Sequence, residues 1–130
     1  MAQDYQNEIQ NKIVKGLLDM IVLELLNKQP MHGYQIIIEI RKVFGIYYGP
    51  STVYPLLETL EKKGVVKSAW TTNFERPRKI YKLTSYGENI LDFAEDSLTL
   101  IRKTMTSGDR IKIEIASSAP TRTKLQYENT

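Results

Sequence analysis

Apolar residues recur at helical spacing in several segments of the chain, most clearly in GPSTVYPLLETLEKKG, residues 49–64. The i, i+3, i+4, i+7 spacing of one buried helix face is followed by Val53, Leu56, Leu57 and Leu60. Gly49 and Pro50 suit the N-cap and the first helical position, and Gly64 suits a helix end. The pattern predicts a helix over about 50–63.

Pro55 lies inside this predicted helix, although an interior proline removes a backbone hydrogen bond and costs roughly 3 kcal/mol. On the helical wheel it falls opposite the apolar stripe, and the lost bond is the one to the carbonyl of Ser51. The loss of this hydrogen bond is least damaging on a solvent-exposed face near the start of the helix. Because local rules tend to break at functional sites, we interpret this outer face as a functional surface.

Two stripes predict helices upstream, one from about Tyr5 to Asn27 and one from His32-Gly33 to Phe44-Gly45. The first stripe contains Ile9, Ile13, Leu17, Met20, Ile21 and Leu25, and the core side of the second contains Ile36, Ile37, Ile40 and Val43. After the helix at 50–63 the period changes. Residues 65–72 and 79–84 are rich in β-branched and aromatic side chains and flank a polar segment, which predicts a two-stranded hairpin.

A long helix is predicted from Thr84, which suits an N-cap, to about Thr106. It carries a heptad seam whose members step by 4, 3, 4, 3 and 4 residues: Gly87, Leu91, Ala94, Leu98, Ile101 and Met105. A chain this small has little else to cover such a seam, so we expect a second copy to do so, with Ile9 and Ile13 joining the interface. Packing onto the chain's own first helix is the alternative, and the two are compatible.

Three helices followed by a hairpin and a long helix predict a mainly α protein with a β-hairpin wing. This is the winged helix-turn-helix arrangement, in which the third helix enters the DNA major groove and the hairpin flanks it. We expect a DNA-binding domain with its N-terminal helix over 1–84 and a dimerisation helix over 85–106. A short strand-like segment (RIKIEI) and a loose tail are expected over 107–130.

Composition narrows the class of protein. A chain of 130 residues with 42% hydrophobic and 25% charged residues fits one soluble domain. The absence of cysteine excludes disulfides, and a single histidine makes no ordinary metal site. No apolar run approaches the roughly 20 residues that cross a bilayer, so we expect a cytoplasmic protein without membrane contact. No nucleophile–base pair or phosphate loop is recognisable, and we expect neither an enzyme nor a cofactor.

The net charge of +3 is compatible with nucleic acid, but its distribution says more. Arg76, Arg78, Lys79 and Lys82 cluster at the hairpin tip, where they could neutralise phosphates or simply form a solvated surface. Hydroxyls on the outer face of the third helix can bond bases or phosphates. The predicted DNA-binding residues are Tyr34, Ser51, Thr52, Tyr54, Pro55, Thr59, Lys62, Arg76, Arg78 and Lys79.

Three side chains near the predicted DNA-binding surface have two interpretations each. His32, the sole histidine, precedes a predicted helix and suits a capping or packing role better than a ligand role. Tyr34 is either a ring at the edge of the core or a hydroxyl on a DNA phosphate. Trp70, on the first hairpin strand, is expected to pack within the fold rather than to stack on a ligand.

Residues 12–91 also resemble a known family. The most specific pieces are His32-Gly33-Tyr34, the Tyr54-Pro55 pair with Leu57 and Leu60 behind it, and Tyr81-x-Leu83-Thr84 followed by Gly87. They are similar to the PadR family of bacterial and archaeal transcriptional regulators, in its short subgroup with one C-terminal helix. The family usually has more glycine and arginine at the wing tip than this chain's FERPR, residues 74–78.

The resemblance implies a homodimeric repressor that binds double-stranded DNA at a pseudo-palindromic operator and responds to a small-molecule effector or to stress. We expect a recognition helix over about 50–63 in the major groove and a wing over 65–84 on the phosphate backbone. A winged-helix adaptor that docks another protein is the alternative, and it would favour exposed apolar groups over arginines at the hairpin tip.

Overall fold

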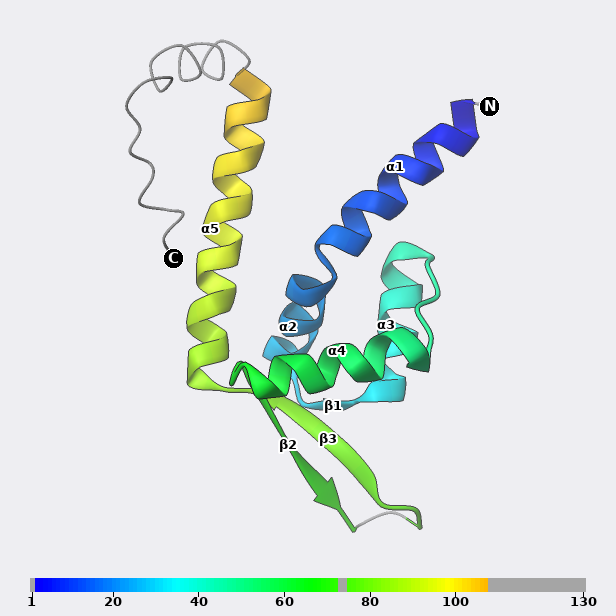
Figure 1. Cartoon of the computed structure of the whole chain (residues 1–130), viewed down its shortest axis with the longest axis vertical. Coiled ribbons are helices and arrows are strands. Elements are labelled where there is room, and N and C mark those ends of the chain that lie inside the picture. Colours follow the sequence, from blue (N-terminus) through cyan, green and yellow to red (C-terminus); the bar gives the residue numbers. More distant parts are fainter. Residues whose placement is uncertain (1, 73–74, 108–130) are drawn as a thin grey trace. The chain divides into compact units, whose positions relative to one another are not determined.

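The computed structural model describes residues 2–72 and 75–107. Its elements are α1 (Ala2–Gly16), α2 (Leu18–Lys28), β1 (Met31–His32), α3 (Gly33–Phe44), α4 (Pro50–Lys62), β2 (Val66–Thr71), β3 (Arg78–Leu83) and α5 (Ser85–Ser107) (Figure 1). The mainly α fold with a hairpin wing is confirmed. The predicted strand-like segment and tail after Ser107 lie outside the described residues. The chain divides into two compact units, the first ending at Phe93 and the second beginning at Ala94.

The single helix predicted from Tyr5 to Asn27 is wrong, because the structure has two helices separated at Leu17. Leu17 has φ −102° and ψ 11°, outside the usual helical range. Its amide is 3.1 Å from the carbonyl oxygens of both Ile13 and Val14. Gly16 precedes it, and glycine is about 1 kcal/mol less favourable than alanine inside a helix. The break therefore falls where the helix is weakest.

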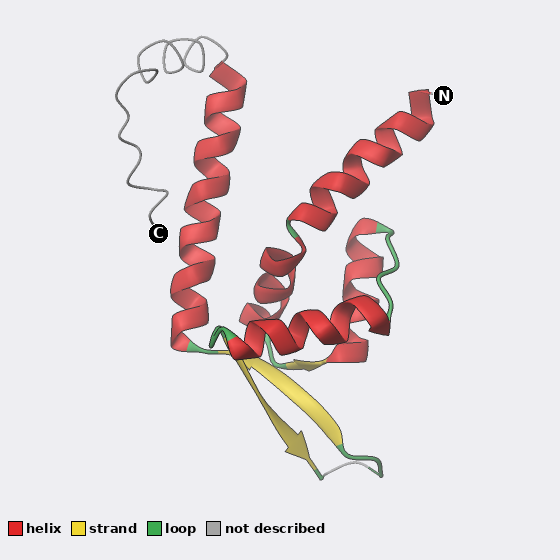
Figure 2. Cartoon of the chain, viewed as in Figure 1, coloured by secondary structure: helices red, strands yellow, loops and turns green. Residues whose placement is uncertain are grey.

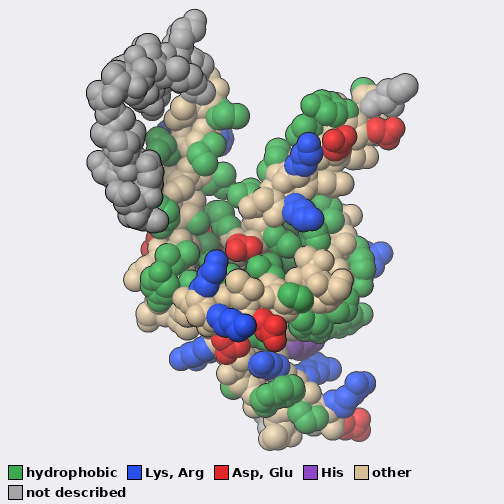
Figure 3. Space-filling model, in the orientation of Figure 1, with side chains coloured by type: hydrophobic (Ala, Val, Ile, Leu, Met, Phe, Trp, Pro, Cys, Tyr) green, Lys and Arg blue, Asp and Glu red, His purple; other side chains and the backbone are tan. Residues whose placement is uncertain are grey.

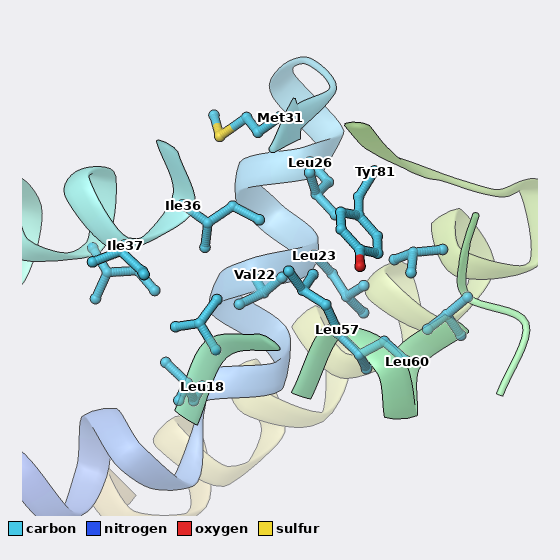
Figure 4. Close-up of a cluster of buried hydrophobic side chains, with 14 of the residues drawn as sticks. Leu18, Val22, Leu23, Leu26, Met31, Ile36, Ile37, Leu57, Leu60 and Tyr81 are labelled. Carbon is cyan, nitrogen blue, oxygen red and sulfur yellow. The ribbon is translucent and has the colours of Figure 1, made fainter. Parts of the chain in front are cut away.

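The core of the first unit lies where α2, α3, α4 and the base of the hairpin meet. In Figure 4, side chains of α2, α3 and α4 converge with Tyr81 of β3. The buried side chains include Leu18, Val22, Leu23, Leu26, Ile36, Ile37, Ile40, Val53, Leu57, Leu60, Val66, Tyr81 and Leu91. Val43, predicted to face the core, is instead 65% exposed. Phe44 packs against the core in that turn of α3.

The strands form one antiparallel sheet in the order β1-β3-β2 (Figure 2). Val66 pairs with Leu83 at the base of the hairpin, and Thr71 pairs with Arg78 near its tip. β1 was not predicted, since two residues are too few to show a period. It pairs His32 with Ile80, and this places the start of α3 beside the hairpin.

The start of α5 is fixed to the turn between α4 and β2. The Gly87 amide donates to the Thr84 hydroxyl at 2.9 Å, which confirms Thr84 as the N-cap, and that hydroxyl donates to the Gly64 carbonyl at 2.7 Å. A Cβ at Gly87 would collide with the Val65 carbonyl oxygen. Gly87 therefore permits a close approach within the chain's own fold.

Candidate nucleic-acid interface

α4 has a buried face and an exposed face, as predicted. Gly49 is the N-cap in extended conformation (φ −85°, ψ −174°), and its carbonyl accepts from the amides of Thr52 and Val53 at 3.0 Å each. Val53, Leu57 and Leu60 are at most 3% exposed. All six predicted DNA-binding residues of α4 are exposed: Ser51, Thr52, Tyr54, Pro55, Thr59 and Lys62. Pro55 thus lies inside the helix but on its solvent-exposed side.

Tyr54 holds α4 against the start of α3. Its ring lies so close to Gly33 that a Cβ there would overlap the ring carbons. The Tyr54 side chain nevertheless stays 42% exposed. This contact explains why the His32-Gly33-Tyr34 and Tyr54-Pro55 pieces of the sequence belong together, because one supplies the space that the other fills.

A groove of about 1050 Å³ opens between α4, the start of α3 and the hairpin. It is lined by His32, Gly33, Tyr34, Tyr54, Trp70, Glu75, Arg76, Pro77, Arg78, Lys79 and Tyr81. Five of the ten predicted DNA-binding residues are brought together there: Tyr34, Tyr54, Arg76, Arg78 and Lys79. The other five are exposed on α4 but do not line the groove. In Figure 3 lysine and arginine side chains gather around the hairpin.

Trp70 is not the packing residue that the sequence predicted. Its side chain is 67% exposed and lines the groove. Lys79, its partner across the hairpin, places Nζ 5.9 Å from the centre of the Trp70 ring and 5.8 Å from that of Tyr81. At these distances an ammonium group is attracted to the faces of both rings.

Glu61 ties the end of α4 to the hairpin, a contact that the sequence did not reveal. Its carboxylate accepts from the Ser68 amide at 3.1 Å and from the Ser68 hydroxyl at 2.8 Å. Hydrogen bonds to an ionised carboxylate are among the stronger ones in proteins. The carboxylate therefore helps fix the position of the hairpin relative to α4. Sequence spacing carries no signal for such a pair, because the geometry depends on how the chain turns at Gly64.

His32 caps α3, as predicted, and also contacts the hairpin. Its Nδ1 accepts from the Gln35 amide at 3.3 Å, and its Nε2 lies 3.1 Å from a guanidinium nitrogen of Arg78. Burial, and then the positive charge of Arg78, lower the pKa of His32 from its ordinary 6.5. A neutral imidazole has one accepting nitrogen and a protonated ring has none. His32 therefore accepts from only one of the two donors at a time, and protonation removes that acceptor.

A model of the PadR-like family of transcriptional regulators matches residues 22–92. The chain belongs to this family. It is similar to a PadR family transcriptional regulator from Eggerthella lenta, with 27% identity, a TM-score of 0.73 and coverage of 82% of this chain and 93% of that one. A PadR-like transcription factor from Bacteroides fragilis shares 29% identity at a TM-score of 0.67, with 77% and 97% of the two chains covered.

Two further proteins are similar to the chain. A transcriptional regulator from Clostridium thermocellum has 26% identity and a TM-score of 0.66, over 74% of this chain and 96% of that one. An uncharacterized protein of Lysinibacillus sphaericus is 31% identical over 86 residues, which is 64% of this chain and 79% of the relative. The family and fold are those of transcriptional regulators, not of enzymes. Among the described helices, none is long and apolar enough to cross a membrane.

The residues predicted for dimerisation of this PadR-like chain differ in exposure. Leu91 is 2% exposed, within the core of its own chain, and Ala94 is half-buried. Exposure then rises along α5, to 37% at Leu98, 55% at Ile101 and 69% at Met105. On α1, the exposed fractions of Ile9 and Ile13 are 38% and 56%. Five of the seven side chains are thus large apolar groups open to solvent.

Proposed function

We propose that this PadR-like protein is a homodimeric repressor that binds double-stranded DNA sequence-specifically in the cytoplasm. Its α4 enters the major groove and its β2–β3 hairpin lies on the phosphate backbone. The observation that carries this proposal is the groove. It combines Tyr54, from the exposed face of a helix, with Arg76, Arg78 and Lys79 of the hairpin.

We assign base reading to α4 because the exposed side chains near the start of this helix are short and polar. Ser51 and Thr52 offer hydroxyls that can donate to or accept from base edges, and Tyr54 offers a phenol. Pro55 leaves the Ser51 carbonyl without its helical partner on this face.

Phosphate binding is assigned to the hairpin because cations outnumber acids there. Among the described residues that line the groove, Glu75 is the single acid beside Arg76, Arg78 and Lys79. A protein adaptor would instead favour apolar groups over arginines at the tip. Trp70 is an exposed apolar side chain on this hairpin, but Arg76, Arg78 and Lys79 line the same groove, and we therefore favour DNA as the partner over a protein.

Dimerisation is assigned to the exposed apolar groups of α5 and α1. Leu98, Ile101 and Met105 continue a heptad repeat, and their side chains are exposed in the part of the chain that the structure describes. A second copy would cover them and hold two α4 helices together. Such a dimer reads two half-sites about one helical turn apart, which fits a pseudo-palindromic operator. A small-molecule effector would then act by changing how the two reading helices are spaced.

Titration of a labelled duplex with the full chain over a series of salt concentrations tests the proposal. If the three groove cations of both chains neutralise phosphates, log Kd against log salt concentration should have a slope of roughly 5, at about 0.9 per phosphate. Preferred sequences should bind more tightly than scrambled ones. No binding to any duplex, or affinity that does not change with salt, would reject the proposal.

A further inference from the structure

The strand face that packs into the core continues beyond it at Trp70. Val66, Ser68 and Trp70 alternate along β2 and so point to one face of the sheet, opposite Leu83, Tyr81 and Lys79 of β3. Along this face the exposed fraction is 1% at Val66 and 4% at Tyr81, but 67% at Trp70. The hairpin extends past the helices that cover its base (Figure 1). Trp70 lies on the uncovered part.

An exposed tryptophan of this kind needs an explanation, because the large indole ring is usually mostly buried. Exposed indoles are enriched at interfaces, since one ring supplies a large rigid contact area together with an N–H donor. Trp70 lines the same groove as Tyr54 of α4. Its neighbour Lys79 carries a positive charge within 5.9 Å of the ring centre. The groove thus presents the flat apolar ring of Trp70 next to the ammonium group of Lys79.

We propose that Trp70 is a DNA contact, with its ring packed on the deoxyribose of a backbone strand and Lys79 paired with the adjacent phosphate. The inference rests on the proposed function and adds a residue to it. The flat apolar ring suits a sugar, and the ammonium group beside it suits the phosphate next to that sugar. The cations Arg76 and Arg78 in the same groove favour a polyanion over a protein or a neutral ligand. Since sugars and phosphates repeat at every step, the contact is independent of base sequence.

The chain contains one tryptophan, so its fluorescence reports on this position alone. The test excites Trp70 in the full-length protein during titration with an unlabelled duplex of about 30 base pairs, long enough for two half-sites. A parallel titration with a labelled duplex measures binding by anisotropy. We expect quenching, and protection of Trp70 from iodide, with the same midpoint as the anisotropy change. Both should occur with a preferred and with a scrambled sequence.

Substitutions then measure the contribution of the ring. Trp70→Ala should weaken binding to both duplexes by about 10-fold, equivalent to about 1.4 kcal/mol, and Trp70→Phe should weaken it less. Tyr86→Ala is the matched control, because Tyr86 is 54% exposed and lies just past the base of the hairpin. It should bind as the wild type does. Melting temperatures should not change, since both rings are exposed.

The outcomes separate this inference from the proposed function. DNA binding seen by anisotropy, with Trp70 fluorescence and iodide access unchanged, would overturn the contact and leave the proposed function standing. A loss in Trp70→Ala confined to the preferred duplex would also overturn it, because the ring would then be reading bases. Absence of any anisotropy change would reject both.

Discussion

The first and the later turns of α5 carry the same repeat of apolar residues, but among the described residues only the first turns bury it in the core. Leu91 is 2% exposed, whereas Leu98, one heptad further, is 37% exposed and Met105, another heptad on, is 69% exposed. The hairpin shows the same change, from Val66 at its base to Trp70 near its tip. A repeat identifies which face is apolar, but the extent of the core decides where that face is covered. Where the apolar face continues past the core, we interpret it as a surface that binds partners.

The largest difference between the two parts of α5 should appear in folding stability. Leu91→Ala should lower the free energy of unfolding by about 2 to 5 kcal/mol, because it leaves a cavity in a packed core. Leu98→Ala should cost much less in dilute protein, where no second copy covers the side chain. Urea denaturation of both variants measures the difference. Equal losses at all protein concentrations would show that α5 is a single buried element.

Dimer formation should depend on the later turns of α5 and not on the first turns. Leu98→Asp should leave the fold intact, and it should abolish the dimer because an unpaired charge buried in an interface costs several kcal/mol. Binding to DNA should weaken, since two half-sites are no longer joined. Sedimentation of wild type and variant at micromolar concentration is the measurement. A wild type that sediments as a monomer would contradict the assignment.

Buried and exposed positions can also be compared within α4, whose exposed face is expected to read bases. Thr52→Ala and Tyr54→Phe should each cost on the order of 1 to 3 kcal/mol at a preferred sequence and little on a scrambled one, because each removes one hydroxyl from the reading face. Pro55→Ala should melt at the wild-type temperature or higher, since the helical bond to Ser51 is restored, yet bind the preferred sequence more weakly. Thermal melting and duplex titration are needed together. A much lower melting temperature for Pro55→Ala would make the ring a packing residue.

Arg76 should contribute to affinity through charge alone. Arg76→Ala should weaken binding similarly on all sequences and reduce the salt slope by about 1 for each DNA-bound chain. Arg76 is a cleaner choice than Arg78, whose guanidinium also contacts His32. A changed sequence preference with an unchanged salt slope would instead place Arg76 on a base edge.

The smallest expected effect is on the pH dependence of stability. The pKa of His32 is lowered in the folded chain, so below about pH 6.5 the unfolded chain takes up a proton that the folded chain resists. The stabilisation is therefore complete above that pH and is lost as the pH falls. His32→Asn keeps an acceptor at the N-cap without titrating there. Its melting temperature should fall less than that of the wild type between pH 7 and about pH 5.5, and parallel curves would rule out His32 as the cause.

Most of the fold could be predicted from the sequence because its signals are local. The period of α4, the glycine and proline at its start, and the capping threonine of α5 all act within a few residues. The break at Leu17 and the two-residue strand β1 were missed, since a one-residue interruption and so short a strand leave no periodic signal. Val43 was misplaced because Phe44, next to it, packs against the core in its place.

The candidate site was predictable in part. Exposed residues on α4 and the cations of the hairpin follow from pattern and charge. Trp70 was assigned to packing because alternation along β2 gives its face correctly, but it does not give the distance that the hairpin extends past the helices. The Glu61–Ser68 and His32–Arg78 contacts depend on tertiary geometry alone.

Selection of bound sequences from a random DNA pool by the full-length protein tests the central claim most directly. If α4 reads bases and a homodimer joins two copies, the selected sequences should contain an inverted repeat with half-site centres about one helical turn apart, and Leu98→Asp should select at most a single half-site. Enrichment of a single half-site by the wild type would contradict the dimer. Absence of any enriched sequence would contradict base reading by α4.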